Sequence, residues 1–353
     1  MTELDKQESL KLKDDGDARL RGFAPAEMVT CKSCLRANPP TRSNCVYCGE
    51  RLPASEKSDI VRAEPHAMPA ETTGGFHVVL SAPTNELPDE LRLGQIAARS
   101  GLTPADLQAA LAAGKRLPLF KVDTAEQAHQ FVVDFRALGI QTISLKDDDY
   151  NSRSAHKKIS ALEFSSAGVT GLVKISRERL FENWSDLILM VVGRLQANNV
   201  EDVTRRKQGK QKQVDRRELI DDESVIDVYS RSNQEGWRIL AGSFDFSCLD
   251  ERKGITAFEN FRALIEMFRE RAENMEVENS YLKVRSLLTQ VWPLRVGTRT
   301  GGWRRSGGGK FDLSTLTTTD NEAQFTNYSR LLQFLKMREL QNQKPDRQGG
   351  SHD

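Results

Sequence analysis

Apolar positions between residues 76 and 148 fall in short continuous runs, separated by stretches with helical spacing. Such runs are typical of buried strands, and apolar positions three or four residues apart are typical of helices. Helix starts are marked by Thr103-Pro104 and by Thr124, which has a capping-box partner in Gln127. The pattern predicts a small domain with the order β-α-α-β-α-β. Its strands are expected at Phe76–Leu80, Leu117–Val122 and Ile140–Leu145, and its first helix at Leu91–Ser100.

From Lys158 the spacing changes to an alternation of apolar and polar positions, which is typical of half-buried strands. Helical stripes follow a capping box formed by Thr256 and Glu259, and a second one formed by Thr319 and Glu322. Residues 158–340 are therefore expected to form a mostly antiparallel β domain with C-terminal helices. Its strands are predicted at Ile159–Phe164, Val169–Ile175, Leu187–Val192, Ser224–Tyr229 and Trp237–Phe246.

Four pieces of the small domain resemble the C-terminal domain of the bacterial ribosomal stalk protein: Val78-Val79-Leu80, Gly101-Leu102, Ala125-Glu126 and Leu138-Gly139-Ile140. The resemblance implies that fold over residues 76–148. In the stalk family an Ala-Lys pair on the second helix helps to dock translation GTPases. This chain has Ala105-Asp106-Leu107 there, so GTPase docking is not expected. Farther along, the meander of strands and the segment Trp184-Ser-Asp186-Leu-Ile188 resemble the pleckstrin-homology-like superfold.

Four cysteines form two Cys-x-x-Cys pairs ten residues apart, Cys31 with Cys34 and Cys45 with Cys48. Two such pairs predict one structural Zn²⁺, because each tight turn points two thiolates inward. A redox site needs one pair in a thioredoxin-like sheet, and two disulfides do not suit an intracellular chain. We therefore expect a zinc ribbon over residues 28–53, between a disordered segment 1–27 and a linker 54–75. Residues 341–353 are expected to be a disordered tail.

The turn Asn38-Pro39-Pro40 and the step Cys48-Gly49 resemble those of short bacterial zinc ribbons, which implies a structural or protein-docking role. The cysteine spacing also matches the Ran-binding-protein type of finger. That family usually has a tryptophan where this chain has Val29, and its ubiquitin-binding members have Thr-Phe where this chain has Leu35-Arg36. The zinc ribbon is therefore expected to bind neither RNA bases nor ubiquitin.

Charge and composition narrow the classes of function. The chain has 51 Lys and Arg against 50 Asp and Glu, so no overall basic field attracts nucleic acid or anionic lipid. The first twenty residues are charged throughout and do not predict a secretory signal. The longest apolar run, Leu187–Val192, is far shorter than the roughly 20 residues that span a bilayer. Metal-type cysteines favour a reducing, cytoplasmic location.

Two basic segments are candidate contacts for anions or nucleic acid: Arg205, Arg206, Lys207, Lys210 and Lys212 in one, and Arg304 and Arg305 in the other. The first lies in a basic stretch that runs on to Arg217 between two predicted strands, so a solvated hairpin loop is the favoured interpretation. No aromatic residue interrupts it, so no base-stacking platform is expected. The second segment, Gly301–Lys310, lacks the spacing of a phosphate-binding P-loop, and a flexible loop with one anchoring tryptophan is expected.

No group of residues meets the requirements of an active site, so an enzyme is not expected. Cys248 follows an apolar stretch without a neighbouring histidine and is predicted to be a small packing residue. The sequence thus predicts a zinc-binding interaction or regulatory protein, with the zinc ribbon docking a protein partner. The alternative is a nucleic-acid or ribosome-associated protein that uses the zinc ribbon and the basic loop predicted at residues 205–217.

Overall fold

The computed structural model describes residues 28–32, 35–39, 42, 45, 52, 75–84, 90–150, 155–207, 210–233 and 235–343. The chain is an α+β protein, and among these residues no helix is long and apolar enough to cross a membrane. The predicted disordered segment 1–27 and nearly all of the predicted linker lie outside the described residues. So does the predicted tail, except for residues 341–343, of which Gln341 and Asn342 end the last helix.

The small β-α-α-β-α-β region has the predicted order. Strand β3 (Phe76–Leu80) lies between β4 (Leu117–Val122) and β5 (Thr142–Lys146), antiparallel to both. Its helices are α1 (Glu90–Ser100), α2 (Pro104–Ala112) and α3 (Ala125–Ala137), followed by the short α4 (Asp147–Tyr150). The hydroxyl of Thr103 accepts a hydrogen bond from the Asp106 amide, and Thr124 and Gln127 form the complete capping box.

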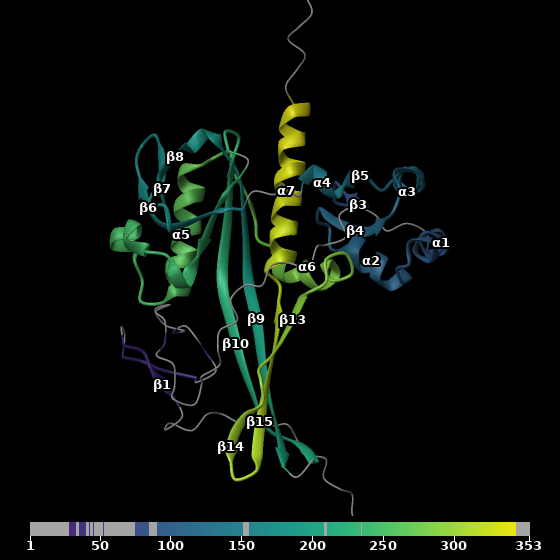
Figure 1. The fold of residues 1–353 in the computed structure, drawn as a ribbon. Helices are drawn as coiled ribbons and strands as arrows, with labels where there is room; N and C mark the ends of the chain where they lie inside the picture. The colour runs from purple at the N-terminus through teal and green to yellow at the C-terminus, as the bar shows by residue number, and fades with distance from the viewer. Residues whose placement is uncertain are drawn as a thin grey trace, which may run out of the picture.

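The large region is a curled, mostly antiparallel mixed sheet that forms a half-barrel (Figure 1). Strands pair in the order β13-β15-β9-β10-β11-β6-β7-β8, with β12 beside β9 and β14 beside β15; β11–β6 and β12–β9 are the parallel pairs. The strands are β6 (Lys157–Phe164), β7 (Gly168–Val173), β8 (Arg179–Asn183), β9 (Leu187–Lys207), β10 (Lys210–Ser230), β11 (Trp237–Leu240), β12 (Glu276–Glu278), β13 (Arg295–Thr300), β14 (Arg304–Gly307) and β15 (Lys310–Asp320).

Helices cover both faces of the sheet, which explains why Leu187–Val191 and Val225–Tyr229 are nearly continuous apolar runs. Helix α5 (Ala257–Arg271) packs with Leu187 and Ile226 in one core. Helices α6 (Tyr281–Leu288) and α7 (Glu322–Asn342) pack with Ile188, Leu189, Val225 and Tyr229 in another. Both cores lie in the half of β9 and β10 nearest the helices.

The small region shares the second core with α6 and α7. The Trp292 ring, just after α6, lies 5.8 Å from the His77 ring and 6.3 Å from the Tyr150 ring. An ion pair of 3.4 Å joins Lys115 to Glu278, and Arg116 pairs with Glu276. The small region is thus packed against the large one along α6 and α7 (Figure 1).

Strands β9 and β10 continue far beyond the helices as a projecting ribbon (Figure 1). Each strand has 21 residues, and their side chains change from buried near the helices to exposed at the far end. Strands β13, β14 and β15 join the ribbon on the β9 side. The expectation of a basic loop over residues 205–217 is therefore wrong: these residues lie in paired strands, and only residues 208–209, outside the described ones, separate β9 from β10.

Three other sequence expectations are corrected. The strand predicted at Trp237–Phe246 ends at Leu240, because the chain turns there into short 3-10 helices at Ala241–Ser243 and Phe246–Arg252. The last helix begins at Glu322 instead of Thr319, because the threonine-rich segment before it continues β15 to Asp320. The expected flexible loop at Gly301–Lys310 is largely a hairpin of β14 and β15, in which Gly309 has a φ of 65°. Glycine adopts this left-handed conformation without strain, so it suits the tight turn.

Candidate functional site

The far end of the ribbon brings together the two basic segments that the sequence separates by about a hundred residues. Strand β15 pairs with β9 and β14 at once, and β9 pairs with β10. Three cross-strand rows result, which we call the ribbon tip. The rows are Lys210–Lys207–Lys310–Gly307, Gln211–Arg206–Phe311–Arg305 and Lys212–Arg205–Asp312–Arg304.

The first and third rows share one face of the ribbon tip, because side chains two residues apart on a strand point the same way. We call it the lysine face. Arg205 donates two hydrogen bonds to the Asp312 carboxylate, of 2.7 and 2.8 Å, and this contact holds the pKa of Asp312 below its usual value. No ion pair among the described residues involves the other cations of this face, which are Lys207, Lys210, Lys212, Arg304 and Lys310.

The second row forms the opposite face, which we call the tryptophan face. The guanidinium carbon of Arg206 lies 5.0 Å from the centre of the Trp303 ring and 5.9 Å from that of Phe311. These are cation–π distances. The aromatic rings that are missing from the stretch 205–217 are therefore supplied by the β13–β14 connection and by β15.

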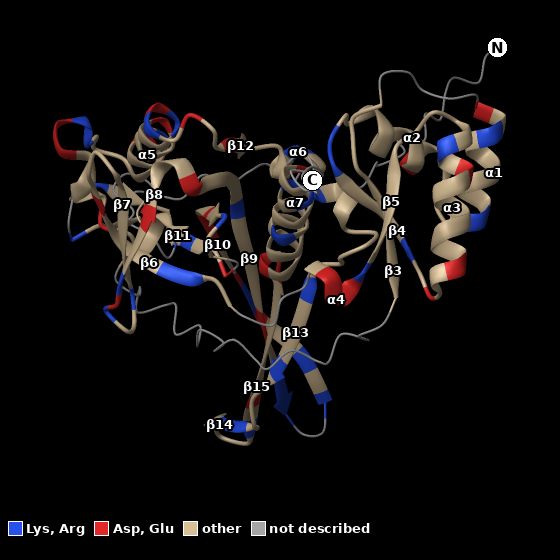
Figure 2. Cartoon of the chain, turned by 90° about the horizontal axis from the view of Figure 1, so that it is seen from above, with Lys and Arg blue, Asp and Glu red and all other residues tan. Residues whose placement is uncertain are grey.

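Positive charge dominates both faces of the tip. Segments 204–213 and 303–312 together contain eight Lys and Arg residues and a single acid, Asp312. Figure 2 shows Lys and Arg gathered where β14 and β15 meet the end of the ribbon. Arg216 and Arg217, which the sequence also placed in the basic stretch, lie farther from the tip and face Asp202 at 4.0 Å and Asp215 at 3.1 Å. They are thus locally neutralised.

No family model, curated protein or solved structure matches this chain. The resemblances to the stalk-protein domain, the pleckstrin-homology-like superfold and bacterial zinc ribbons stay predictions.

Two of the four predicted zinc ligands can be described. Cys31 and Cys45 are buried and share a small apolar cluster with Leu52, whereas Cys34 and Cys48 lie outside the described residues. The Cys31 carbonyl accepts a hydrogen bond of 2.9 Å from the Leu35 amide, and Leu35 has a φ of 59°. Such a tight turn fits a metal-binding knuckle. Among the described residues alone, no group of three metal ligands occurs.

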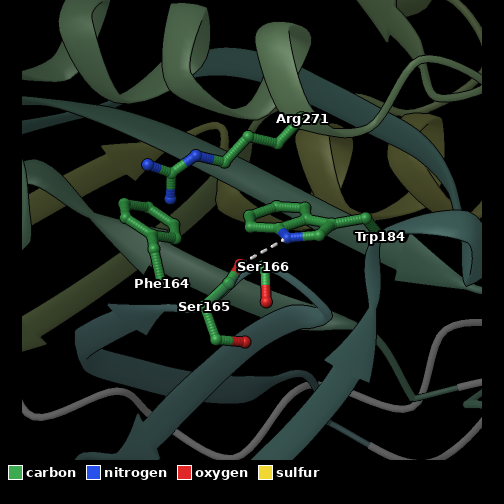
Figure 3. Close-up of a pocket in the computed structure, with 5 residues that line it drawn as sticks. All are labelled: Phe164, Ser165, Ser166, Trp184 and Arg271. Atoms are coloured by element: carbon green, nitrogen blue, oxygen red, sulfur yellow. Dashed lines mark hydrogen bonds between the residues drawn. The ribbon is translucent and has the colours of Figure 1, made fainter.

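An open cavity of about 400 Å³ lies between α5 and the β6–β7 turn (Figure 3). The Trp184 Nε1 donates a 2.9 Å hydrogen bond to the Ser165 carbonyl, which fixes the turn. The Arg271 guanidinium stacks 4.7 Å from the Phe164 ring centre. Arg271 is the one titratable group among its five lining residues, so the cavity offers no acid–base pair.

Cys248 lies beside the core under α5, as expected for a packing residue. Burial raises the pKa of its thiol to about 11, which keeps it protonated at neutral pH. A protonated thiol is a weak nucleophile, so Cys248 does not provide a reactive centre.

Proposed function

We propose that the chain binds nucleic acid through the cations of the ribbon tip. The observation that carries the proposal is the convergence of Arg205–Lys212 with Arg304–Lys310 on one exposed projection. Within the described residues, seven of the eight cations there have no carboxylate in ion-pair contact, so their charges are available to an external anion.

The spacing of the cations suits a polymer of phosphates. Adjacent strands lie about 4.8 Å apart, and side chains on one face of a strand repeat at about 6.7 Å. The lysine face therefore presents several cations within reach of successive phosphates. Each phosphate neutralised by Lys or Arg releases counterions, which is the main source of sequence-independent affinity. A planar lipid surface would meet one face of the ribbon at a time, whereas the tip is positive on both.

The test replaces Lys207, Lys210 and Lys212 together with alanine and measures binding to oligonucleotides over a range of salt concentrations. Each lost phosphate contact should lower the slope of log affinity against log salt by about 0.7 to 0.9. The triple variant should therefore bind more weakly and show a slope smaller by about 2 to 3. All three side chains are exposed, so the fold should persist, and circular dichroism can verify this.

A matched control removes the same charge elsewhere. Lys158, Lys174 and Lys283 are exposed lysines outside the ribbon tip, and their triple alanine variant should keep the salt slope of the natural sequence. If the two triple variants lose affinity equally, the tip is not the binding site. If the unmodified chain binds no oligonucleotide at low salt, the proposal fails.

We also propose that residues 28–53 form a zinc ribbon that docks a protein partner in the cytoplasm, without a catalytic step. The buried Cys31 and Cys45 and the tight turn after Cys31 support the metal site. Arg42 lies 3.1 Å from Asp222 of β10, so this segment contacts the large sheet. The metal would contribute folding energy, because so small a segment has little core of its own.

A further inference from the structure

The two faces of the ribbon tip differ in the chemistry they offer. The lysine face has point charges and no aromatic ring, whereas the tryptophan face combines Arg206 and Arg305 with Trp303 and Phe311. Phosphates suffice to engage the lysine face. The second face has a feature that phosphate binding does not need, namely an aromatic ring held beside a cation at an exposed edge.

We infer that the tryptophan face makes the ribbon tip a binding site for single-stranded nucleic acid, with an unpaired base stacked on Trp303. The inference rests on the proposed function and adds the class of nucleic acid. Bases in a duplex are stacked on their neighbours and hide their faces, so a stacking side chain favours unpaired strands.

Burial of the tryptophans supports this assignment. Three of the four, Trp184, Trp237 and Trp292, are 8%, 2% and 7% exposed and belong to the cores or pack against them. Trp303 is 36% exposed and directly precedes β14, the strand that Figure 1 shows at the far end of the ribbon, away from the helices. Tryptophan has a large apolar body with a polar N–H and is enriched at binding interfaces.

The surroundings of Trp303 hold the ring without enclosing it. Arg206 is 5.0 Å from the ring centre, and it comes from β9, in the middle of the paired rows. Gly301 is tied to the sheet by a 2.8 Å hydrogen bond from its amide to the Ser314 carbonyl. A Cβ added to Gly302 would meet no atom within 4 Å, so the space beside this connection is open. Gln211, opposite Arg206, adds an exposed amide that can hydrogen-bond a base edge.

The experiment compares the full chain's binding to an oligothymidylate and to a duplex of the same length, at one salt concentration, by fluorescence anisotropy of the labelled nucleic acid. Base–aromatic stacking contributes a factor of about 5 to 150 per base, so the single strand should bind tighter by a factor in that range. The oligothymidylate should also quench the intrinsic tryptophan fluorescence, because Trp303 is the exposed ring.

Three variants separate stacking from charge. Trp303→Ala should abolish both the preference for single strands and the quenching. Trp303→Phe should keep most of the preference while losing the quenching, since a ring remains. Arg304→Ala, on the lysine face, should lower the affinity for the single strand and for the duplex by a similar factor, so the preference for the single strand should remain.

Equal affinity for single strand and duplex, unchanged by Trp303→Ala, would overturn this inference and leave the proposed function standing. Binding of neither ligand would overturn both. Trp303 lies outside the cores, so loss of folding is not expected from its replacement, and circular dichroism checks this.

Discussion

Replacing Arg238 with methionine should destabilise the large sheet, because the change leaves Asp227 as an unpaired buried charge. Arg238 on β11 donates hydrogen bonds of 2.7 and 2.8 Å to the two carboxylate oxygens of Asp227 on β10. Asp227 is 0% exposed and Arg238 is 3% exposed. Nearby, His156 Nε2 lies 3.4 Å from an Asp227 carboxylate oxygen and 2.7 Å from the Tyr229 hydroxyl. Burial lowers the pKa of His156 to about 4, so at neutral pH its imidazole brings no charge to Asp227, and it becomes charged only in acid.

The size of the effect follows from this burial. Removing one partner of a buried ion pair costs about 3–5 kcal/mol, because the remaining charge has lost both water and its partner. Methionine replaces the aliphatic part of the arginine side chain and loses only the guanidinium, so the lost charge should dominate. Since each 1.4 kcal/mol is a factor of ten, the unfolding equilibrium constant should rise by roughly two to four powers of ten.

The dependence on pH distinguishes a lost charge partner from a packing defect. In the natural chain burial tends to raise the pKa of Asp227, but the charges of Arg238 and His156 and the hydrogen bonds from Arg238 and Ser329 hold the pKa below its usual value. The pair therefore stabilises the fold above about pH 4, and this contribution is lost as pH falls through the lowered pKa. In Arg238→Met burial should raise that pKa instead, so acid should narrow the difference between variant and natural chain.

The assay is urea unfolding followed by circular dichroism at several pH values. A double variant, Asp227→Leu with Arg238→Met, should recover most of the lost stability, because it removes both charges. The reasoning is refuted if Arg238→Met alone lowers the free energy of unfolding by less than about 1 kcal/mol, or if this loss does not depend on pH.

Three further predictions concern other parts of the chain. Burial lowers the pKa of His156 to about 4, so between about pH 6.5 and pH 4 only the unfolded chain takes up a proton at this residue. The free energy of unfolding should therefore fall by about 3 kcal/mol over this range, and His156→Gln should flatten the profile in urea unfolding at stepped pH. Gly193→Ala should cost about 1–3 kcal/mol in urea unfolding, because its Cβ would lie 2.3 Å from the Phe325 ring, whereas Gly297→Ala meets open space and should change little. Elemental analysis should find one zinc per chain, lost on replacing Cys31 or Cys48 with serine, and a metal-free natural protein would exclude the site.

Local signals predicted the small region well. Thr124 with Gln127, and Thr103 before Pro104, mark helix starts through contacts between neighbours in the chain, so they depend little on the rest of the fold. Gly101 and Gly139, with φ of 77° and 76°, end helices by the same kind of local geometry. Such signals therefore predict helix boundaries from the sequence alone.

The sequence does not predict the projecting ribbon of β9 and β10, because its residues have no apolar pattern. Alternation marks a strand when one face meets a core, as at Ile159–Phe164, but both faces of the distal parts of β9 and β10 meet solvent. Their pairing depends on a partner more than a hundred residues away, in the case of Lys207 with Lys310. For the same reason the sequence could not place Trp303 beside Arg206, since the two become neighbours only when β15 pairs with β9.

The length of the ribbon has an electrical consequence. Lys207 lies twelve residues along β9 from Leu195, which pairs with Glu223, so about 40 Å separates the tip from this acid near the helices. The closer Asp202 and Asp215 face Arg216 and Arg217. At physiological salt the Debye length is about 8 Å, and charges so far apart hardly sense one another. A polyanion that approaches the tip therefore meets a local excess of positive charge, although the whole chain carries a net charge of +1. The net charge of the chain therefore does not indicate what the ribbon tip attracts; the local charge of the tip does.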